Sequence, residues 1–127
     1  RYRAGVTGVW DSARDALARG EGVCQDQAHV AIAACRAVGV PARYVSGYLL
    51  DEAAAQAASH AWVDLWDAAT ASWFSCDVTH RRPAGERLCR LAVGRDYLDA
   101  APVRGIRRGG GDEALSVSVQ VSASQQQ

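Results

Sequence analysis

The first third of the chain carries the apolar spacing of helices. Between residues 22 and 38, apolar side chains recur every three or four positions, at Ala28, Ala31, Ile32, Cys35 and Val38. This pattern predicts a main helix over residues 22–38, which a glycine and a proline directly afterwards bring to an end. A shorter helix is predicted over residues 11–18, with Asp11 or Ser12 as its N-cap and a glycine at its end.

The middle of the chain changes to the patterns of β-strands. Runs rich in β-branched and aromatic residues predict strands over residues 42–50, 60–66, 72–76 and 88–93. The short turn at residues 67–71 joins two of these strands, which predicts an antiparallel hairpin. The alanine-rich segment 51–58 is expected to be a mobile connection, and residues 81–86 are expected to form a polar loop.

Strict alternation of apolar and polar residues occurs near the C-terminus. Four apolar residues alternate there with serine and glutamine: Leu115, Val117, Val119 and Val121. This period of two predicts another strand with one face in water. Residues 123–127 are expected to be a frayed tail.

One long helix followed by an antiparallel sheet is typical of an α+β domain. A chain of 127 residues, of which 49% are hydrophobic, is long enough for one domain with its own core. We therefore expect a single domain over residues 1–127. The chain begins at Arg1 and contains no methionine, so we expect it to be part of a longer protein.

Charge and cysteine content narrow the class of protein. The 14 basic and 14 acidic residues balance, so no global charge favours nucleic acid or an anionic membrane, and no apolar run approaches the length of a membrane span. The cysteines form no C-x-x-C pair, which argues against a zinc ribbon or a thioredoxin-type site. With only four cysteines, the chain is not disulfide-dense, so we expect free thiols and a cytoplasmic location.

The most informative segment is Gly-Glu-Gly-Val-Cys-Gln-Asp-Gln-Ala-His at residues 20–29. It places Cys24 where a glycine-rich loop leads into the main helix. Free backbone N–H groups and the positive end of the helix dipole favour a thiolate, so we expect a lowered pKa for the Cys24 thiol. The same N–H groups suit an oxyanion formed on an attacked carbonyl.

A histidine and an aspartate follow on separate predicted strands. His60 lies in a Ser-His-Ala-Trp motif, and Asp77 lies in a Cys-Asp-Val-Thr motif. They span the predicted hairpin, so their side chains can pair across strands about 5 Å apart. Packing of the helix start against this sheet brings Cys24 to His60. This order predicts a nucleophile, a base and an orienting carboxylate, with Asp64 and Asp67 as competitors for the last role.

These motifs resemble those of the transglutaminase-like superfamily, in particular its bacterial members. The resemblance rests on Gly-Val-Cys-Gln-Asp-x-Ala-His, on Gly-Val-Pro-Ala-Arg-Tyr-Val-Ser-Gly-Tyr at residues 39–48, on Ser-His-Ala-Trp, on Asp-x-Thr, and on Gly-Arg-Asp-Tyr at residues 94–97. The motifs occur in the family's order and spacing, and they cover about residues 20–105.

The resemblance implies a papain-like α+β core, in which a central helix carries the nucleophile, and a catalytic triad of Cys24, His60 and Asp77. The implied reaction is acyl transfer on a peptide or protein amide through a thioester on Cys24. Water would resolve the thioester in a hydrolase or protease, and an amine would resolve it in a transglutaminase; both stay open. The Cys24 N–H and either the Trp10 indole or the Gln25 amide are the expected oxyanion donors, and no cofactor is expected.

The chain departs from the family pattern in two places. It reads Asp77-Val78-Thr79-His80 where such proteins usually carry Asp-Pro-Thr-Asn, and it has Gln27 where they usually carry an aromatic residue. Neither change removes a member of the triad. Both are expected to alter the pocket, and Val78 loses a rigid proline turn.

Two other functions fit parts of the same pattern. An inactive binding module would keep the fold, but the intact Cys24, His60 and Asp77 argue against it. A metal site built from these three residues and His80 would quench the nucleophile, so acyl transfer is the preferred hypothesis.

Polar residues near these motifs have structural interpretations. Asp26 is expected to bond near the helix start, and His29 is expected to pair with Asp26. Arg43 and Arg95 are expected to form structural ion pairs.

Overall fold

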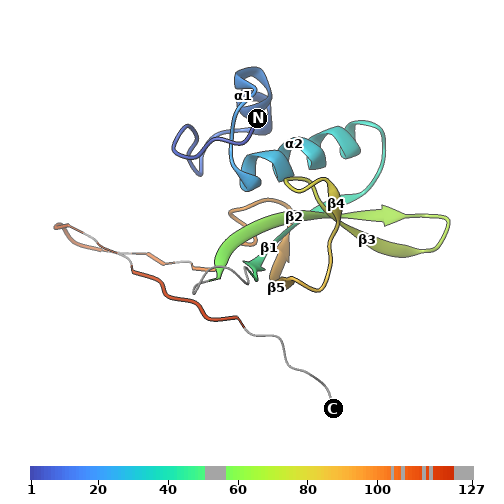
Figure 1. Ribbon diagram of the computed structural model, residues 1–127. Helices are drawn as coiled ribbons and strands as arrows, with labels where there is room; N and C mark the ends of the chain where they lie inside the picture. The colour runs from blue at the N-terminus through green and yellow to red at the C-terminus, as the bar shows by residue number, and fades with distance from the viewer. Residues whose placement is uncertain (51–56, 104, 107, 113, 115, 122–127) are drawn as a thin grey trace, which may run out of the picture.

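The computed structural model describes residues 1–50, 57–103, 105–106, 108–112, 114 and 116–121. In this part of the chain, a five-stranded antiparallel sheet is covered on one face by two helices. The second helix packs against the sheet, and the first helix packs against the second (Figure 1). This is the α+β architecture that the sequence predicts.

The two helices begin and end at the signals read from the sequence. Helix α1 spans Ala13–Arg19, and helix α2 spans Cys24–Ala37. Ser12 caps α1 by accepting a hydrogen bond from the N–H of Asp15, while the Asp15 carboxylate accepts from the N–H of Ser12. Gly20 ends α1 in the left-handed region, at a φ of 71°.

The loop before α2 is held in place by Asp26. Its carboxylate accepts hydrogen bonds from the Val23 N–H at 2.7 Å and from the Thr7 hydroxyl at 2.6 Å. A Cβ atom at Gly22 would lie 2.7 Å from the Cβ of Asp26, so glycine is required at that position. Asp26 therefore has the structural role expected for it, and it fixes the chain directly before Cys24.

The sheet contains each strand predicted before residue 100 and one that was not predicted. In chain order the strands are β1 Ala42–Leu49, β2 Ala58–Asp67, β3 Ser72–Asp77, β4 Arg82–Pro83 and β5 Leu88–Gly94. The predicted hairpin is confirmed as the antiparallel pair β2–β3. Strand β4 lies in the predicted polar loop, and it pairs with the end of β3. In space the order is β4-β3-β2-β1-β5.

The core lies between α2 and the sheet. Its buried members are Ala28, Ile32, Ala42, Tyr44, Ala61, Val63 and Ala100. Cys35 and Cys76 pack against this cluster, and all four cysteines are free thiols, as expected. No helix in the described part of the chain has the length and apolar character needed to cross a membrane.

The strand predicted near the C-terminus does not form. The described residues 116–121 have no strand structure, although the carbonyl of Val119 accepts a hydrogen bond from the N–H of Ala57 at 3.3 Å. The alternating pattern was misleading because a strand needs a ladder of such bonds with a neighbouring edge. Residues 51–56 of the predicted mobile connection and the predicted tail lie outside the described residues.

Candidate active site

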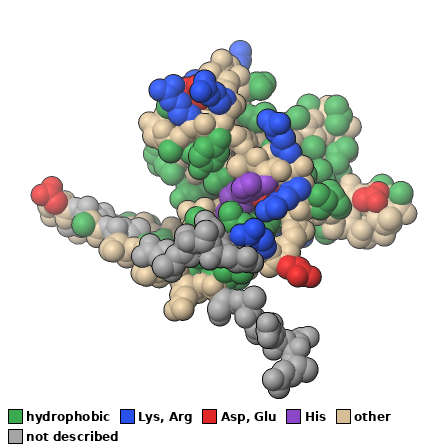
Figure 2. Space-filling model, viewed as in Figure 1, with side chains coloured by type: hydrophobic (Ala, Val, Ile, Leu, Met, Phe, Trp, Pro, Cys, Tyr) green, Lys and Arg blue, Asp and Glu red, His purple; other side chains and the backbone are tan. Residues whose placement is uncertain are grey.

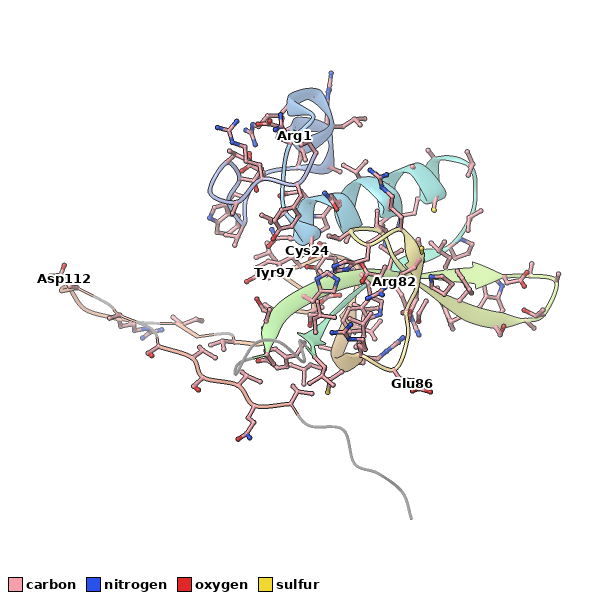
Figure 3. All side chains as sticks on the ribbon, in the orientation of Figure 1. Arg1, Cys24, Arg82, Glu86, Tyr97 and Asp112 are labelled. Atoms are coloured by element: carbon pink, nitrogen blue, oxygen red, sulfur yellow. The ribbon has the colours of Figure 1, made fainter. Side chains whose placement is uncertain are left out.

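The start of α2, the middle of β1 and the start of β2 line a cavity of about 220 Å³. Its walls are formed by Cys24, Gln25, Tyr44, Ser46, Gly47, Ser59, His60, Ala61, Tyr97 and Pro102. In Figure 3, Cys24 lies at the first turn of α2 directly above the sheet, with Tyr97 beside it. The predicted packing of the helix start against the sheet therefore brings Cys24 and His60 to one cavity.

The half-buried thiol of Cys24 meets opposing influences. Burial raises its pKa above the ordinary value, and the nearby Asp77 carboxylate acts in the same direction. Backbone N–H groups of Ala61, Gln25 and Cys24 itself face the sulfur and lower the pKa, but they do not outweigh burial. The predicted lowering of the Cys24 pKa is therefore wrong, because burial destabilises the thiolate by more than the backbone N–H groups stabilise it.

His60 and Asp77 meet across strands β2 and β3, as the hairpin predicts. The His60 Nε2 atom lies 3.1 Å from the Asp77 Oδ2 atom, and both side chains are almost completely buried. This pairing leaves Nδ1 as the ring nitrogen of His60 that Asp77 does not contact. Figure 2 shows histidine side chains gathered at the centre of the visible face, with arginine side chains next to them.

Asp77 receives three hydrogen bonds in all. The backbone N–H of His80 donates to Oδ1 at 3.2 Å, and the His80 Nδ1 atom lies 2.7 Å from Oδ2, the same oxygen that His60 contacts. Burial alone would raise the pKa of Asp77, but these hydrogen bonds and the charge of His60 hold it below its usual range. The carboxylate is therefore ionised and fully engaged at neutral pH.

The position of His60 depends on a large aromatic neighbour. The rings of His60 and Trp62 stack with their centroids 6.2 Å apart, and Trp62 is buried. The Trp62 ring lies over Gly47 on β1, where an added Cβ atom would stand 2.6 Å from the ring and 2.1 Å from the carbonyl oxygen of Cys89. Gly47 is therefore the only residue type that lets Trp62 take this place.

The two competing carboxylates have other partners. Asp64 accepts from Arg43, Arg90 and Ser75. Asp67 binds within its own turn, to Ala69 and Thr70. Of the three candidates, Asp77 is the one within hydrogen-bonding distance of His60.

The predictions for the polar residues around the site have mixed outcomes. His29 does not pair with Asp26; its Nε2 atom accepts the Tyr97 N–H at 3.0 Å, and burial lowers its pKa. Trp10 is 82% exposed and borders a different cavity, so among the two suggested second oxyanion donors only Gln25 lies beside Cys24. Arg43 forms the expected structural ion pair, with Asp64.

The four residues of the alternative metal site, which the sequence analysis did not favour, are brought together only in part. Within the described residues, the ligand atoms of His60, Asp77 and His80 lie within 4.8 Å of one another, and Cys24 is not a member of this group. The hydrogen bonds to Asp77 account for the arrangement of these atoms.

Two features of the site escaped sequence reasoning. His80 was considered as a metal ligand and not as a partner of Asp77, although its position three residues after Asp77 places it in the same turn. Tyr44 and Tyr97 line the cavity, and their rings pack edge to face at 6.3 Å. Both tyrosines occur within the motifs already quoted, which was the available signal.

The fold and the cavity define a class of α+β domain in which a thiol at a helix start shares a pocket with an imidazole–carboxylate pair on an antiparallel sheet. A model of the transglutaminase-like superfamily core matches residues 1–78. The chain belongs to this superfamily.

The chain is also similar to mycobacterial proteins. The chain is 41% identical to Uncharacterized protein ML0607 of Mycobacterium leprae, with 95% of this chain and 44% of the relative covered. It is 38% identical to Uncharacterized protein Rv2569c of Mycobacterium tuberculosis, over 83% of this chain and 37% of the relative. The chain thus spans less than half the length of these relatives.

A solved structure shares the fold. The crystal structure of "a Putative Cysteine Protease from Cytophaga hutchinsonii" superposes with a TM-score of 0.70 and 37% sequence identity, over 80% of this chain and 33% of that one. At 37% identity, the two chains are similar in sequence as well as in the arrangement of helices and strands.

Proposed function

We propose that this domain catalyses acyl transfer from amides through a thioester on Cys24, with His60 as base and Asp77 as the residue that orients the base. The observation that carries the proposal is the shared cavity of Cys24 and His60, combined with the 3.1 Å contact between His60 and Asp77. The similarity to the solved structure titled "a Putative Cysteine Protease" supports the same reaction class.

The reaction begins with a proton transfer from the Cys24 sulfur to the imidazole of His60. Because Asp77 engages Nε2, the nitrogen available to take this proton is Nδ1. The sulfur then attacks the amide carbonyl, the carbon–nitrogen bond breaks, and His60 returns the proton to the departing amine. Water or a second amine attacks the thioester, again losing a proton to His60, and releases the acyl group and the Cys24 thiol.

The charge on the attacked oxygen has donors at hand. Backbone N–H groups of Cys24, Gln25 and Ala61 face the sulfur, where the attacked carbonyl would lie. Donors fixed in advance at such a position stabilise a developing oxyanion without having to reorganise. These groups support a tetrahedral intermediate in the cavity beside Cys24.

The substrate we propose is an amide of a peptide or protein, and hydrolysis is the preferred outcome, with amine transfer as the alternative. The cavity adjoins a neighbouring groove, because Ser59, Tyr97 and Pro102 line both of them. An acyl donor can therefore extend beyond the reacting carbonyl.

An inactive binding module is the second candidate. The observation that favours it is the raised pKa of the Cys24 thiol, since a buried neutral thiol is a weak nucleophile. The two candidates differ in whether His60 activates Cys24, and this difference can be measured directly.

The deciding experiment follows the alkylation of each cysteine by iodoacetamide between about pH 5 and about pH 10, a range that includes the ordinary pKa of a thiol. Peptide mass mapping identifies which cysteine has reacted. The exposed Cys89 serves as the internal reference. We expect Cys24 in the parent to react at and below pH 7, because His60 takes its proton. In His60→Ala, burial leaves the Cys24 pKa above that of an ordinary thiol, so its reaction should move to alkaline pH.

Equal profiles for Cys24 in the parent and in His60→Ala would refute the proposal and favour the binding module. If the profiles differ as expected, a glutamine-containing peptide incubated with and without a primary amine separates the reactions by mass. A hydrolase yields the acid or a cleaved peptide, whereas a transferase yields the amine adduct.

A further inference from the structure

The turn after β3 holds the Asp77 carboxylate at both of its oxygens. The backbone N–H of His80 donates to Oδ1 at 3.2 Å, and the Nδ1 atom of the same residue lies 2.7 Å from Oδ2. A carboxylate held at both oxygens by one residue cannot rotate about its Cβ–Cγ bond without losing one of the two contacts.

This restraint matters because Oδ2 has a second partner. The His60 Nε2 atom lies 3.1 Å from the same oxygen, so a rotation of the Asp77 carboxylate would move Oδ2 away from His60. The hydrogen bond between Nε2–H and a carboxylate keeps the proton of a neutral imidazole on Nε2 and leaves Nδ1 free. The direction of the Asp77 carboxylate therefore sets which nitrogen of His60 is the base.

The His80 side chain is not needed to fill the core. It remains 40% exposed, while Asp77 is completely buried and His60 is 6% exposed. The His60 and His80 rings are 5.2 Å apart and tilted by 52°, so they do not stack face to face. The contact that distinguishes His80 from any other residue at this position is the hydrogen bond from Nδ1.

We propose that His80 is a positioning residue, which acts on the base His60 by fixing the Asp77 carboxylate at Oδ2. This inference rests on the proposed function for its catalytic consequence, but its structural content can be measured without any substrate. It gives a role to His80, one of the positions where the sequence departs from the family pattern that it resembles.

The chemistry of side chains supplies matched variants. An asparagine amide nitrogen stands at the same number of bonds from the backbone as the histidine Nδ1 atom, so His80→Asn keeps a donor for Oδ2. The amide nitrogen of glutamine stands one bond further out, so His80→Gln keeps polarity without the donor in that place. His80→Ala removes the donor altogether.

The first measurement is the nitrogen-15 NMR spectrum of the imidazoles, which is simple because the chain has 3 histidines. In the parent and in His80→Asn, we expect neutral His60 to carry its proton on Nε2. In His80→Ala and His80→Gln, we expect His60 to distribute the proton between both nitrogens. An unchanged His60 tautomer in His80→Ala, with His60→Ala used to assign the signals, would overturn the proposal.

The second measurement is the rate of Cys24 alkylation at pH 7 in the same variants. Loss of one hydrogen bond to a charged group should lower the rate about tenfold in His80→Ala and His80→Gln, with less than a twofold change in His80→Asn. Equal rates in all three variants and the parent would overturn the proposal, provided that His60→Ala itself slows the reaction. If His60→Ala has no effect, the proposed function fails, and the NMR result alone decides whether His80 positions Asp77 and His60.

Discussion

Two buried carboxylates lie on the same pair of strands and have opposite kinds of neighbour. Asp64 on β2 and Asp77 on β3 are both completely inaccessible to solvent. Asp64 is bound by Arg43 and Arg90, and Asp77 is bound by His60 and His80.

The difference lies in whether the partners can exchange protons. An arginine keeps its proton at any pH that a protein tolerates, so the Asp64 cluster is a permanent ion-pair network. The Arg43 guanidinium also lies 4.0 Å from the centre of the Trp73 ring, which fixes it further. An imidazole can both donate and accept a proton through its two ring nitrogens, so the Asp77 cluster has the groups that a proton transfer needs.

Burial by itself therefore does not identify a functional carboxylate. In both clusters, hydrogen bonds outweigh burial and hold the carboxylate pKa below its usual range. The partners and the proximity of a cavity with a thiol distinguish Asp77 from Asp64.

The largest effect should come from removing the negative charge of Asp77. Asp77→Asn removes the acceptor that orients His60, and an amide donor in its place favours the wrong tautomer. We expect amide turnover, or Cys24 alkylation at pH 7, to fall by a factor on the order of 10³ to 10⁴. Kinetics on the purified variant measure this loss.

Asp64→Asn is the matched control for that experiment. It removes a charge of the same type from the neighbouring strand, so it should lower the stability of the fold and leave the reactivity of Cys24 within about threefold of the parent. A comparable loss of reactivity in both variants would show that the two clusters are not separate.

A smaller effect is expected from a change at Gly47, which lies under the Trp62 ring that stacks on His60. In Gly47→Ala, the new methyl group must displace both the Trp62 ring and the backbone of the strand that carries Cys89. We expect a loss of about 1–3 kcal/mol in the free energy of unfolding, measured by urea denaturation, together with slower Cys24 alkylation. Gly85→Ala, where no atom lies within 4 Å of the added Cβ, should stay within about 0.5 kcal/mol of the parent.

The smallest effect concerns the arginine cluster in acid. The pKa of Asp64 is lower in the folded protein than in the unfolded chain, where it is about 3.9. Its ionised form therefore stabilises the fold above about pH 4, and this contribution is lost as the pH falls through the folded pKa.

Asp64→Asn has no such contribution to lose. Its free energy of unfolding should decline less steeply than that of the parent below about pH 4, with a difference on the order of 1 kcal/mol. Thermal unfolding at several pH values measures the slope, and parallel slopes in the two proteins would contradict the assigned role of Asp64.

Sequence reasoning was most successful where a signal is local. The capping box at Ser12 and the glycine at position 20 delimit α1, and the apolar spacing predicts α2 nearly to its ends. The short turn between β2 and β3 predicts their antiparallel pairing, and this pairing is what allows His60 to meet Asp77. Local signals failed at residues 116–121, where alternation occurs without a partner strand.

The electrostatics of the site were predicted less well. The position of Cys24 at a helix start suggested a lowered thiol pKa, but burial raises it. The partner of His29 was also assigned wrongly, because the bond from the Tyr97 N–H joins residues far apart in the chain. Desolvation and long-range contacts depend on how the layers pack, and no local pattern contains that information.

The sequence by itself determined the helices, the main strands, the family and the order of a cysteine, a histidine and an aspartate along the chain. These features follow from residue spacing and from capping and turn residues that act over a few positions. The tertiary structure alone decided which of three aspartates contacts His60, that His80 shares the Asp77 carboxylate, and how much water reaches Cys24. Those properties depend on the pairing of β2 with β3, on the conformation of the turn after β3, and on the packing of α2 against the sheet.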